Sequence, residues 1–208
     1  KKIFTNKMKD ITLVIPAKNE SESLPKVLIE LSNYDIKKIV VIPPDDIKTR
    51  DSIKDFDCKI LPQKGIGFGN ALIQGISQVE TKYFCIFNAD GSFNPKYLEK
   101  LIDKLNSNID FVFCSRYEDG GGSDDDTILT YVGNKFFTTF CNLLFNLNLT
   151  DVLFTYVMGS TKAFKDLDMK YNDFSFCVEL PIKAKKKNYS LANLASFERS
   201  RIAGVKKV

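Results

Sequence analysis

The chain has 208 residues, of which 44% are hydrophobic and 27% charged, a composition typical of a soluble globular domain with a full core. The formal net charge of +4 is too small to indicate a nucleic-acid-binding protein, and the lack of histidine excludes imidazole catalysis and histidine metal sites. The five cysteines are odd in number and never form a Cys-x-x-Cys pair, which predicts reduced thiols in a cytoplasmic protein rather than disulfides or a zinc site.

Apolar strands alternate with amphipathic helices along the first half of the chain. Runs of β-branched and aromatic residues predict strands at Ile11–Ile15, Lys38–Ile42, Lys59–Leu61, Tyr83–Phe87 and Asp110–Cys114. Apolar residues at helical spacing predict helices between them, the last of which has Pro95 in its first turn. This alternation predicts an α/β fold with a mostly parallel central sheet and helices on both faces.

The second part of the chain has a different texture. The acidic, glycine-rich segment 118–126 predicts a flexible loop that is too polar to pack, either a plain surface loop or a mobile flap. An apolar-rich helix is expected over Tyr131–Leu149, where polar interruptions favour a packed or membrane-touching amphipathic helix over a spanning one. No stretch reaches the roughly 18 to 20 apolar residues of a membrane span, and no signal peptide is visible.

The fourth predicted strand ends in the polar tripeptide Asn88-Ala89-Asp90. In an open α/β sheet, ligands bind outside the carboxyl ends of the strands, so this strand tip is where a functional site is expected. Asn88 by itself is also typical of a turn residue that caps a strand. The meaning of the tripeptide therefore depends on the motifs that accompany it.

Other motifs accompany this strand tip in chain order. They are Pro16-Ala17-Lys18-Asn19-Glu20, the helix start Gly67-Phe68-Gly69-Asn70-Ala71, Ser115-Arg116-Tyr117 before a Gly-Gly-Gly loop, the later Asp151, and Arg201-Ile202-Ala203-Gly204-Val205-Lys206-Lys207. With Asn88-Ala89-Asp90 in the place of an Asp-X-Asp motif, the ordered set resembles family-2 glycosyltransferases. The nearest resemblance is to the dolichyl-phosphate mannose synthase-like branch, which uses polyprenyl phosphates, and it extends from Thr12 to Lys207.

The resemblance implies a GT-A fold, a Rossmann-like α/β domain that spans residues 1–208 as a single unit. Its donor-binding part would cover about 10–115 and its acceptor-side part about 116–208. The implied reaction is an inverting transfer of a sugar from a GDP- or UDP-linked donor, with a polyprenyl phosphate as the preferred acceptor. Because charge accumulates on the leaving diphosphate, Mg²⁺ or Mn²⁺ is expected as cofactor. No nucleic-acid partner is expected.

The family's functional positions carry over to this chain residue by residue. Asp90 matches the anionic metal ligand, to which Asn88 can add its amide oxygen and Ser92 its hydroxyl. Arg116 and Arg201 match positions associated with the acceptor phosphate, and Asp151 matches an acid that acts as a base or helps fix the metal. Residues expected at the nucleotide are Pro16, Ala17, Asn19, Glu20, Gly67, Asn88 and Ala89.

Alternatives remain for residues and for function. Asp151 is equally typical of a helix-end cap, and Pro43-Pro44-Asp45-Asp46 replaces the family's usual Asp-Asp-x-Ser after the second strand. One alternative function is a family-2 transferase that extends a cell-surface glycan on a saccharide hydroxyl, with Asp151 as an obligatory base. Another is a degenerate, non-catalytic nucleotide-sugar binder. The expected location is the cytoplasm, with peripheral contact at the inner face of the membrane for a lipid acceptor.

Overall fold

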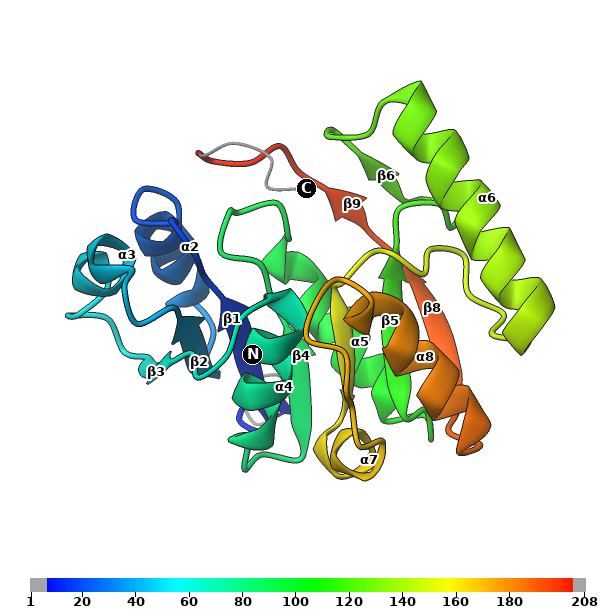
Figure 1. Ribbon diagram of the computed structural model, residues 1–208, viewed down its shortest axis with the longest axis horizontal. Coiled ribbons are helices and arrows are strands. Elements are labelled where there is room, and N and C mark those ends of the chain that lie inside the picture. Colours follow the sequence, from blue (N-terminus) through cyan, green and yellow to red (C-terminus); the bar gives the residue numbers. More distant parts are fainter. Residues whose placement is uncertain (1–6, 204–208) are drawn as a thin grey trace.

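The computed structural model describes residues 7–203, and Figure 1 shows a central sheet flanked by helices. The seven strands of the sheet follow the order β3-β2-β1-β4-β7-β5-β8. Neighbouring strands are parallel except at β7, which runs antiparallel to both β4 and β5. The strands are β1 (Ile11–Pro16), β2 (Lys37–Ile42), β3 (Lys59–Pro62), β4 (Tyr83–Ile86), β5 (Phe111–Ser115), β7 (Val157–Ser160) and β8 (Leu191–Ala195).

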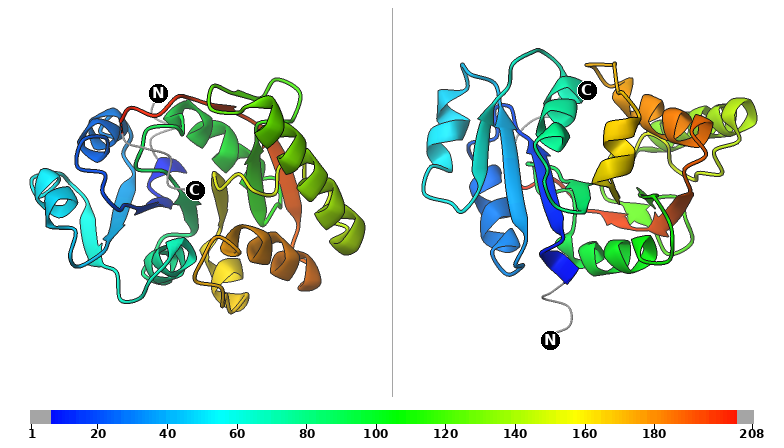
Figure 2. Two further views of the ribbon diagram at one scale, coloured as in Figure 1. Left: turned by 45° about the horizontal axis from the view of Figure 1, so that its top comes forward. Right: turned by 90° about the horizontal axis from the view of Figure 1, so that it is seen from below.

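Helices cover both faces of the sheet, as the two further views in Figure 2 show. On one face α2 and α5 pack into one buried cluster, and on the other α4, α7 and α8 pack into a second. Strand β1 serves both, because Leu13 and Ile15 point into the first cluster and Val14 into the second. The helices are α2 (Leu24–Leu31), α3 (Ile47–Ser52), α4 (Phe68–Ser77), a 3-10 turn (Pro95–Tyr97), α5 (Leu98–Leu105), α6 (Ile128–Phe145), α7 (Thr161–Asp166) and α8 (Phe176–Lys186).

The predicted α/β architecture is confirmed, and each of the five predicted strands is present. The sequence pattern did not indicate β7, which inserts antiparallel between β4 and β5. This strand has only four residues and contains Gly159. A Cβ at Gly159 would meet the ring of Phe111, so the glycine allows an aromatic side chain to pack directly on the strand. The place of β7 in the sheet depends on pairing with two strands that lie far away in the chain.

The acidic segment 118–126 packs against the protein, so the expectation of a loop too polar to pack is wrong. Gly122–Ser123 forms strand β6, which pairs in parallel with β9 (Phe197–Glu198) in a small second sheet. Both strands lie at the top of Figure 1. Asp125 and Asp126 of this segment are able to pack because Arg201 and Arg116 neutralise their carboxylates.

Helix α6 is displaced toward the amino terminus relative to the predicted range 131–149. It begins after Thr127, whose side chain and that of Thr130 form a capping box, and it ends at Asn146 in the left-handed conformation with φ 52°. No helix within residues 7–203 is long and apolar enough to cross a membrane. Gly204 to Lys207 of the C-terminal motif lie outside the described residues.

Candidate functional site

The turn after β1 is held in one shape by the segment that follows β2. Asn19 has a φ of 56°, a left-handed conformation that asparagine tolerates better than most residues. Its backbone N–H donates to Asp46 Oδ2 at 2.6 Å, and the N–H of Glu20 donates to Thr49 Oγ1 at 2.9 Å. The acid of the Pro-Pro-Asp-Asp segment therefore lies beside Pro16–Glu20, the turn that was predicted to receive the nucleotide.

The polar tripeptide forms a tight turn directly after β4. The N–H of Ser92 donates to Asp90 Oδ1 at 2.9 Å, and Asn88 Nδ2 donates to Ser92 Oγ at 3.2 Å. Since the Asn88 amide nitrogen is engaged, its Oδ1 is the atom left to accept, and no residue of the described chain donates to it. Asn88 Oδ1 and Asp90 Oδ2 are therefore the oxygens that this turn can offer to a cation.

These two oxygens fit a divalent cation only in part. Within residues 7–203 no three His, Cys, Asp or Glu side chains gather into a metal site. Mg²⁺ is commonly held by one or two carboxylates together with substrate phosphates and water, and Asp90 with Asn88 matches that incomplete set. Ser92, the third predicted ligand, is buried and already accepts from Asn88. The turn therefore suits a metal that arrives with a diphosphate.

The last described segment runs along this turn. The N–H of Ile202 donates to the carbonyl oxygen of Asp90 at 2.9 Å. Gly91, with φ 86°, lies so close to Ile202 that a Cβ would overlap its side chain. This close contact places Arg201 Nε 3.9 Å from Asp90 Oδ2. A cation from the end of the chain thus stands beside the candidate metal ligand.

Arg116 and Asp151 form a buried ion pair. The Asp151 side chain is 0% exposed and that of Arg116 10%. Arg116 Nε and its backbone N–H donate to Asp151 Oδ2 at 2.7 and 3.3 Å, and Nη2 donates to Oδ1 at 3.1 Å. Burial by itself lowers the pKa of Arg116, but the hydrogen bonds and charge of Asp151 outweigh it and raise the pKa. Both oxygens of Asp151 serve to hold this guanidinium.

Two further carboxylates surround the same guanidinium. Arg116 Nη1 lies 3.3 Å from Glu198 Oε2 and 3.5 Å from Asp126 Oδ1. Burial raises the pKa of Glu198, and the charge of Arg116 opposes that rise. Asp126 also accepts from the hydroxyl of Tyr117 at 2.6 Å. Sequence reasoning missed Glu198, Asp126 and Tyr117 as site residues; the acidic run after the glycines was the signal that an arginine partner was near.

Arg201 is held far more loosely than Arg116. Its Nη2 and Nε lie 3.3 and 3.4 Å from Asp125 Oδ2. The Arg201 side chain is 24% exposed and that of Asp125 32%, so this pair opens to solvent at little cost. Because Asp125 and Asp126 are neighbours, the acidic segment links Arg201 to Arg116. The structure thereby brings the four predicted catalytic residues into one chain of ionic contacts.

The glycines at the start of α4 accommodate the protein's own backbone. A Cβ on Gly67 would overlap the carbonyl oxygen of Asn172, and one on Gly69 would overlap that of Tyr171. The N–H of Asn70 donates to the same Asn172 oxygen at 3.0 Å. Tyr171 and Asn172 belong to the loop between α7 and α8. Glu179 holds this loop in place, because its carboxylate accepts the N–H of Tyr171 at 2.8 Å. The chain itself thus occupies the space at Gly67 that was predicted to receive the donor.

We expect Gly67→Ala to lower the free energy of unfolding by about 2 to 3 kcal/mol, since an alanine would need a strained φ of 107° and would overlap Asn172. Gly133→Ala is the matched control, because Gly133 lies in α6 with nothing within 4 Å of its Cβ position. That change is expected to stabilise by up to about 1 kcal/mol. Urea unfolding measures both. Unchanged stability with weakened nucleotide binding would mean that Gly67 faces the donor instead.

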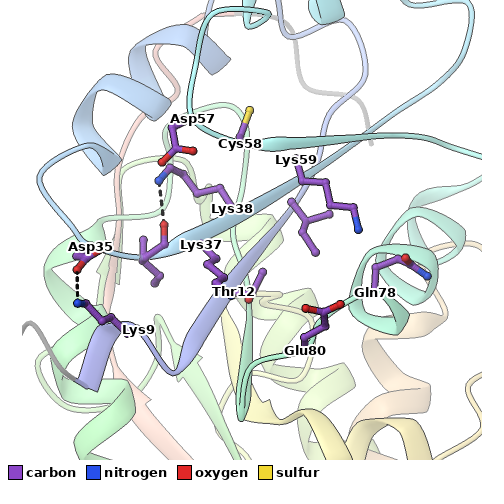
Figure 3. Close-up of a pocket in the computed structure, with 12 residues that line it drawn as sticks. Lys9, Thr12, Asp35, Lys37, Lys38, Asp57, Cys58, Lys59, Gln78 and Glu80 are labelled. Carbon is purple, nitrogen blue, oxygen red and sulfur yellow. Dashed lines mark hydrogen bonds and ion pairs between the residues drawn. The ribbon is translucent and has the colours of Figure 1, made fainter.

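A cavity of about 630 Å³ lies at the opposite edge of the sheet, and Figure 3 shows its lining. It is formed where β1, β2 and β3 begin, by lysines such as Lys37 and Lys59 together with Asp57 and Glu80. Lys9 and Asp35 form an ion pair across its rim at 3.4 Å. Ligands of open α/β sheets bind at the carboxyl ends of the strands, so this cavity is not part of the candidate site.

The model of the family described as "Glycosyl transferase family 2" matches residues 12–168, well over half of the chain. The chain belongs to this family. Among curated relatives, glycosyltransferase AglJ of Haloferax volcanii is 21% identical over 179 residues, which cover 85% of this chain and 59% of AglJ. Dolichol-phosphate mannosyltransferase of Pyrococcus furiosus is 26% identical over 120 residues, 53% of this chain and 34% of that protein. The chain thus spans little more than half of the first relative and a third of the second.

Solved structures share the fold of this family-2 chain. Glucosyl-3-phosphoglycerate synthase from Mycobacterium tuberculosis, in complex with Mn²⁺, UDP and phosphoglyceric acid, has a TM-score of 0.72 at 14% identity, covering 98% of this chain and 74% of that one. Mannosyl-3-phosphoglycerate synthase from Rubrobacter xylanophilus has a TM-score of 0.70 at 14% identity, covering 97% and 71%. At these identities the likeness shows the fold, and the GT-A prediction is confirmed.

In this family-2 chain the predicted site residues fall into distinct environments. Asn88, Asp90 and Arg201 meet at one half-buried turn. Arg116 and Asp151 are locked together behind the acidic segment. Gly67 is packed against backbone. Only the first group combines oxygen atoms that a metal could use with an arginine, Arg201, that can exchange its partner Asp125.

Proposed function

We propose that this chain transfers a sugar from a nucleoside-diphosphate donor, with inversion, to a polyprenyl phosphate. The donor diphosphate would lie at the turn after β4, where Asp90 and Asn88 hold Mg²⁺ or Mn²⁺. When bound, the metal neutralises the charge that develops on the leaving diphosphate. The Mn²⁺ and UDP present in the M. tuberculosis glucosyl-3-phosphoglycerate synthase structure support this assignment, since that enzyme has the same fold.

The observation that carries the acceptor assignment is the contrast between the two arginines. Arg201 stands 3.9 Å from Asp90 and is held otherwise by the half-exposed Asp125, so an incoming phosphate can replace that carboxylate. Arg116 is instead saturated by the buried Asp151 and by the largely covered Asp126 and Glu198. In this proposal Arg201 binds and orients the acceptor phosphate, because its planar fork can hold two oxygens at once. Arg116 is a positioning residue that keeps the acidic segment in place.

The state of Asp151 favours a phosphate acceptor over a sugar hydroxyl. A hydroxyl acceptor needs a base, and Asp151 has both oxygens engaged by Arg116 with no exposure to solvent. A phosphate is already ionised near neutral pH and needs orientation rather than deprotonation. The saccharide-extending alternative would therefore require a different base.

The test supplies GDP-mannose and UDP-glucose in turn, with Mn²⁺, to three acceptors: a short-chain polyprenyl phosphate, 3-phosphoglycerate and an oligosaccharide. We expect transfer to the polyprenyl phosphate, with the anomeric configuration inverted. If 3-phosphoglycerate is the only one of the three that is glycosylated, the acceptor is a small phosphorylated molecule and not a lipid phosphate. Glycosylation of the oligosaccharide alone, or a retained configuration, would overturn the proposal. Nucleotide binding without any transfer would favour the non-catalytic binder.

Two variants of one ion pair test the role of Arg201 in opposite directions. Arg201→Ala is expected to lower kcat/KM for the phosphate acceptor by about 10²- to 10³-fold while donor hydrolysis continues. Asp125→Ala removes the internal partner of Arg201 and is expected to lower the acceptor KM by up to about fivefold. Steady-state kinetics with varied acceptor measure both. Parallel losses in the two variants would indicate a structural role for the pair.

A further inference from the structure

Helix α6 is amphipathic in the inverse sense of an ordinary surface helix. Three of its polar side chains face the protein: Asn134 Nδ2 donates to the Tyr117 hydroxyl at 2.9 Å, and Thr138 Oγ1 accepts the N–H of Val152 at 3.2 Å. Asn142 Nδ2 donates to the carbonyl oxygen of Leu149 at 2.7 Å. Asn134, Thr138 and Asn142 therefore anchor the helix to the rest of the protein.

The opposite side of the helix, here called the outward face of α6, is apolar and exposed. Its large side chains are between 52% and 86% exposed, and from Leu129 onward their positions recur every three or four residues along the helix. They are Ile128, Leu129, Val132, Phe136, Phe140 and Leu143. Figure 1 shows α6 standing out from the rest of the fold at the edge beyond β6. Surface helices normally turn such a stripe inward, so this contiguous patch indicates a binding surface.

The charges around this face indicate what covers it. From Thr127 to Thr150 the only charged residue is Lys135, and no acid occurs. At the carboxyl end of α6, Lys186 Nζ lies 5.9 Å from the ring of Phe145, with Lys185 beside it in α8. Within the described residues none of these three lysines forms an ion pair, and Lys135 Nζ contacts only the ring of Tyr117, 5.4 Å from its centre. An apolar stripe bordered by unneutralised lysines matches the chemistry of an anionic lipid surface.

We propose that the outward face of α6 is the surface by which this protein lies on an anionic phospholipid bilayer. The apolar side chains enter the boundary between headgroups and acyl chains, and Lys135, Lys185 and Lys186 meet lipid phosphates. A second copy of the chain is the competing occupant. In a symmetric dimer the outward face of α6 would pack against the same face of the second copy, so the lysines of the two copies would approach and repel one another. An anionic bilayer instead neutralises these lysines.

The position of α6 connects this surface with catalysis. The helix begins immediately after Asp125 and Asp126, which contact Arg201 and Arg116. A bilayer under α6 would therefore present a lipid-borne phosphate next to the acceptor side of the site. This connection rests on the proposed function, but membrane binding itself does not require it. If the protein binds vesicles but transfers no sugar to the lipid phosphate, the proposed acceptor is wrong and the membrane-binding surface stands. If it transfers sugar in detergent but does not bind vesicles, the membrane-binding surface is wrong and the acceptor stands.

The absence of tryptophan from the chain allows a direct test. Phe136→Trp places a single reporter on the outward face of α6, and Ile29→Trp places a matched one on α2, where Ile29 is 60% exposed. Both are mixed with vesicles of phosphatidylcholine alone or with phosphatidylglycerol in equal parts. We expect only the emission of the α6 reporter to shift to the blue, and to do so with the anionic vesicles. No shift with those vesicles, or an equal shift of both reporters, would overturn the proposal.

Vesicle co-sedimentation of the tryptophan-free chain separates the apolar from the charged contribution. Phe136→Ser with Phe140→Ser is expected to weaken binding by at least about tenfold, while Ile29→Ser leaves it unchanged. Lys185→Gln with Lys186→Gln is expected to weaken binding to anionic vesicles only. Analytical ultracentrifugation completes the test. A dimer that forms without vesicles and is lost in the phenylalanine variant would show that a second copy covers this face.

Discussion

Asp151→Ala is expected to lower the free energy of unfolding by about 3 to 5 kcal/mol, the largest effect on stability anticipated for a single change in the site. The substitution leaves the Arg116 guanidinium buried, and the remaining carboxylates, Glu198 and Asp126, lie farther away at 3.3 and 3.5 Å. The ion pair offsets the free-energy cost of taking the guanidinium out of water, and without Asp151 most of that cost is no longer offset. Urea denaturation followed by circular dichroism measures the change.

Asp166→Ala is the matched control for this prediction. Asp166 also pairs with a cation, Lys187 at 2.9 Å, but its side chain is 52% exposed. Loss of such a solvated pair is expected to change the free energy of unfolding far less than Asp151→Ala does. Equal effects of the two substitutions would contradict the account of Arg116 and Asp151 as a buried pair.

Asp151→Asn separates a positioning role from a catalytic base. The amide keeps one oxygen to accept from Arg116 but lacks the charge, so we expect a smaller loss of stability than with alanine and a parallel, partial loss of activity. A base would behave differently. If asparagine abolished turnover while stability stayed near that of the wild type, Asp151 would have to reach the acceptor in a rearranged site.

Asp90→Ala is expected to remove the enhancement of nucleotide binding by Mn²⁺ and to lower turnover by about 10³-fold or more, the largest effect anticipated on activity. Asp90 is the only carboxylate of the turn after β4, and a bound metal supplies several kcal/mol of charge stabilisation to the leaving diphosphate. Calorimetric titration of UDP and GDP with and without Mn²⁺ measures the binding. Nucleotide binding that is indifferent to both Mn²⁺ and Asp90 would sink the metal assignment.

Asn88→Asp is the companion variant, because it restores a second carboxylate at the same turn. The added charge is expected to raise the affinity for Mn²⁺ in the presence of nucleotide, in the direction opposite to Asp90→Ala. Its effect on turnover depends on whether the tighter metal still releases product. If Asn88→Asp leaves Mn²⁺ affinity unchanged, Asn88 serves as a turn residue and not as a ligand.

Much of the fold could be predicted because its determinants are local. The run Tyr83–Phe87 is apolar throughout and is followed by polar residues, which indicates a buried strand and its end without reference to the rest of the chain. The same is true of β1 and of α5, which follows the 3-10 turn at Pro95. Strand β7 could not be predicted in this way, since its place between β4 and β5 depends on segments far away in the chain.

The candidate site divides along the same line. The resemblance correctly indicated the family and the GT-A fold, and it drew attention to Asp90, Arg116, Asp151 and Arg201 as residues that the structure joins. It did not indicate which of the two arginines can bind a phosphate. That depends on the partners of Arg116, which are Asp151, 35 residues away, and Glu198, 82 residues away. Burial of those partners distinguishes a positioning arginine from one that can exchange its partner.

The sequence by itself determined the family, the alternation of strands and helices, and the polar turn after β4, because periodicity and strand-end chemistry are properties of short segments. Only the tertiary structure decided that the acidic segment packs on arginines, that backbone packs against Gly67, and that α6 turns Asn134, Thr138 and Asn142 inward. The physical reason is the same in each case. The free energy of a charge, a glycine or an apolar face depends on what lies against it, and distant parts of the chain supply those neighbours.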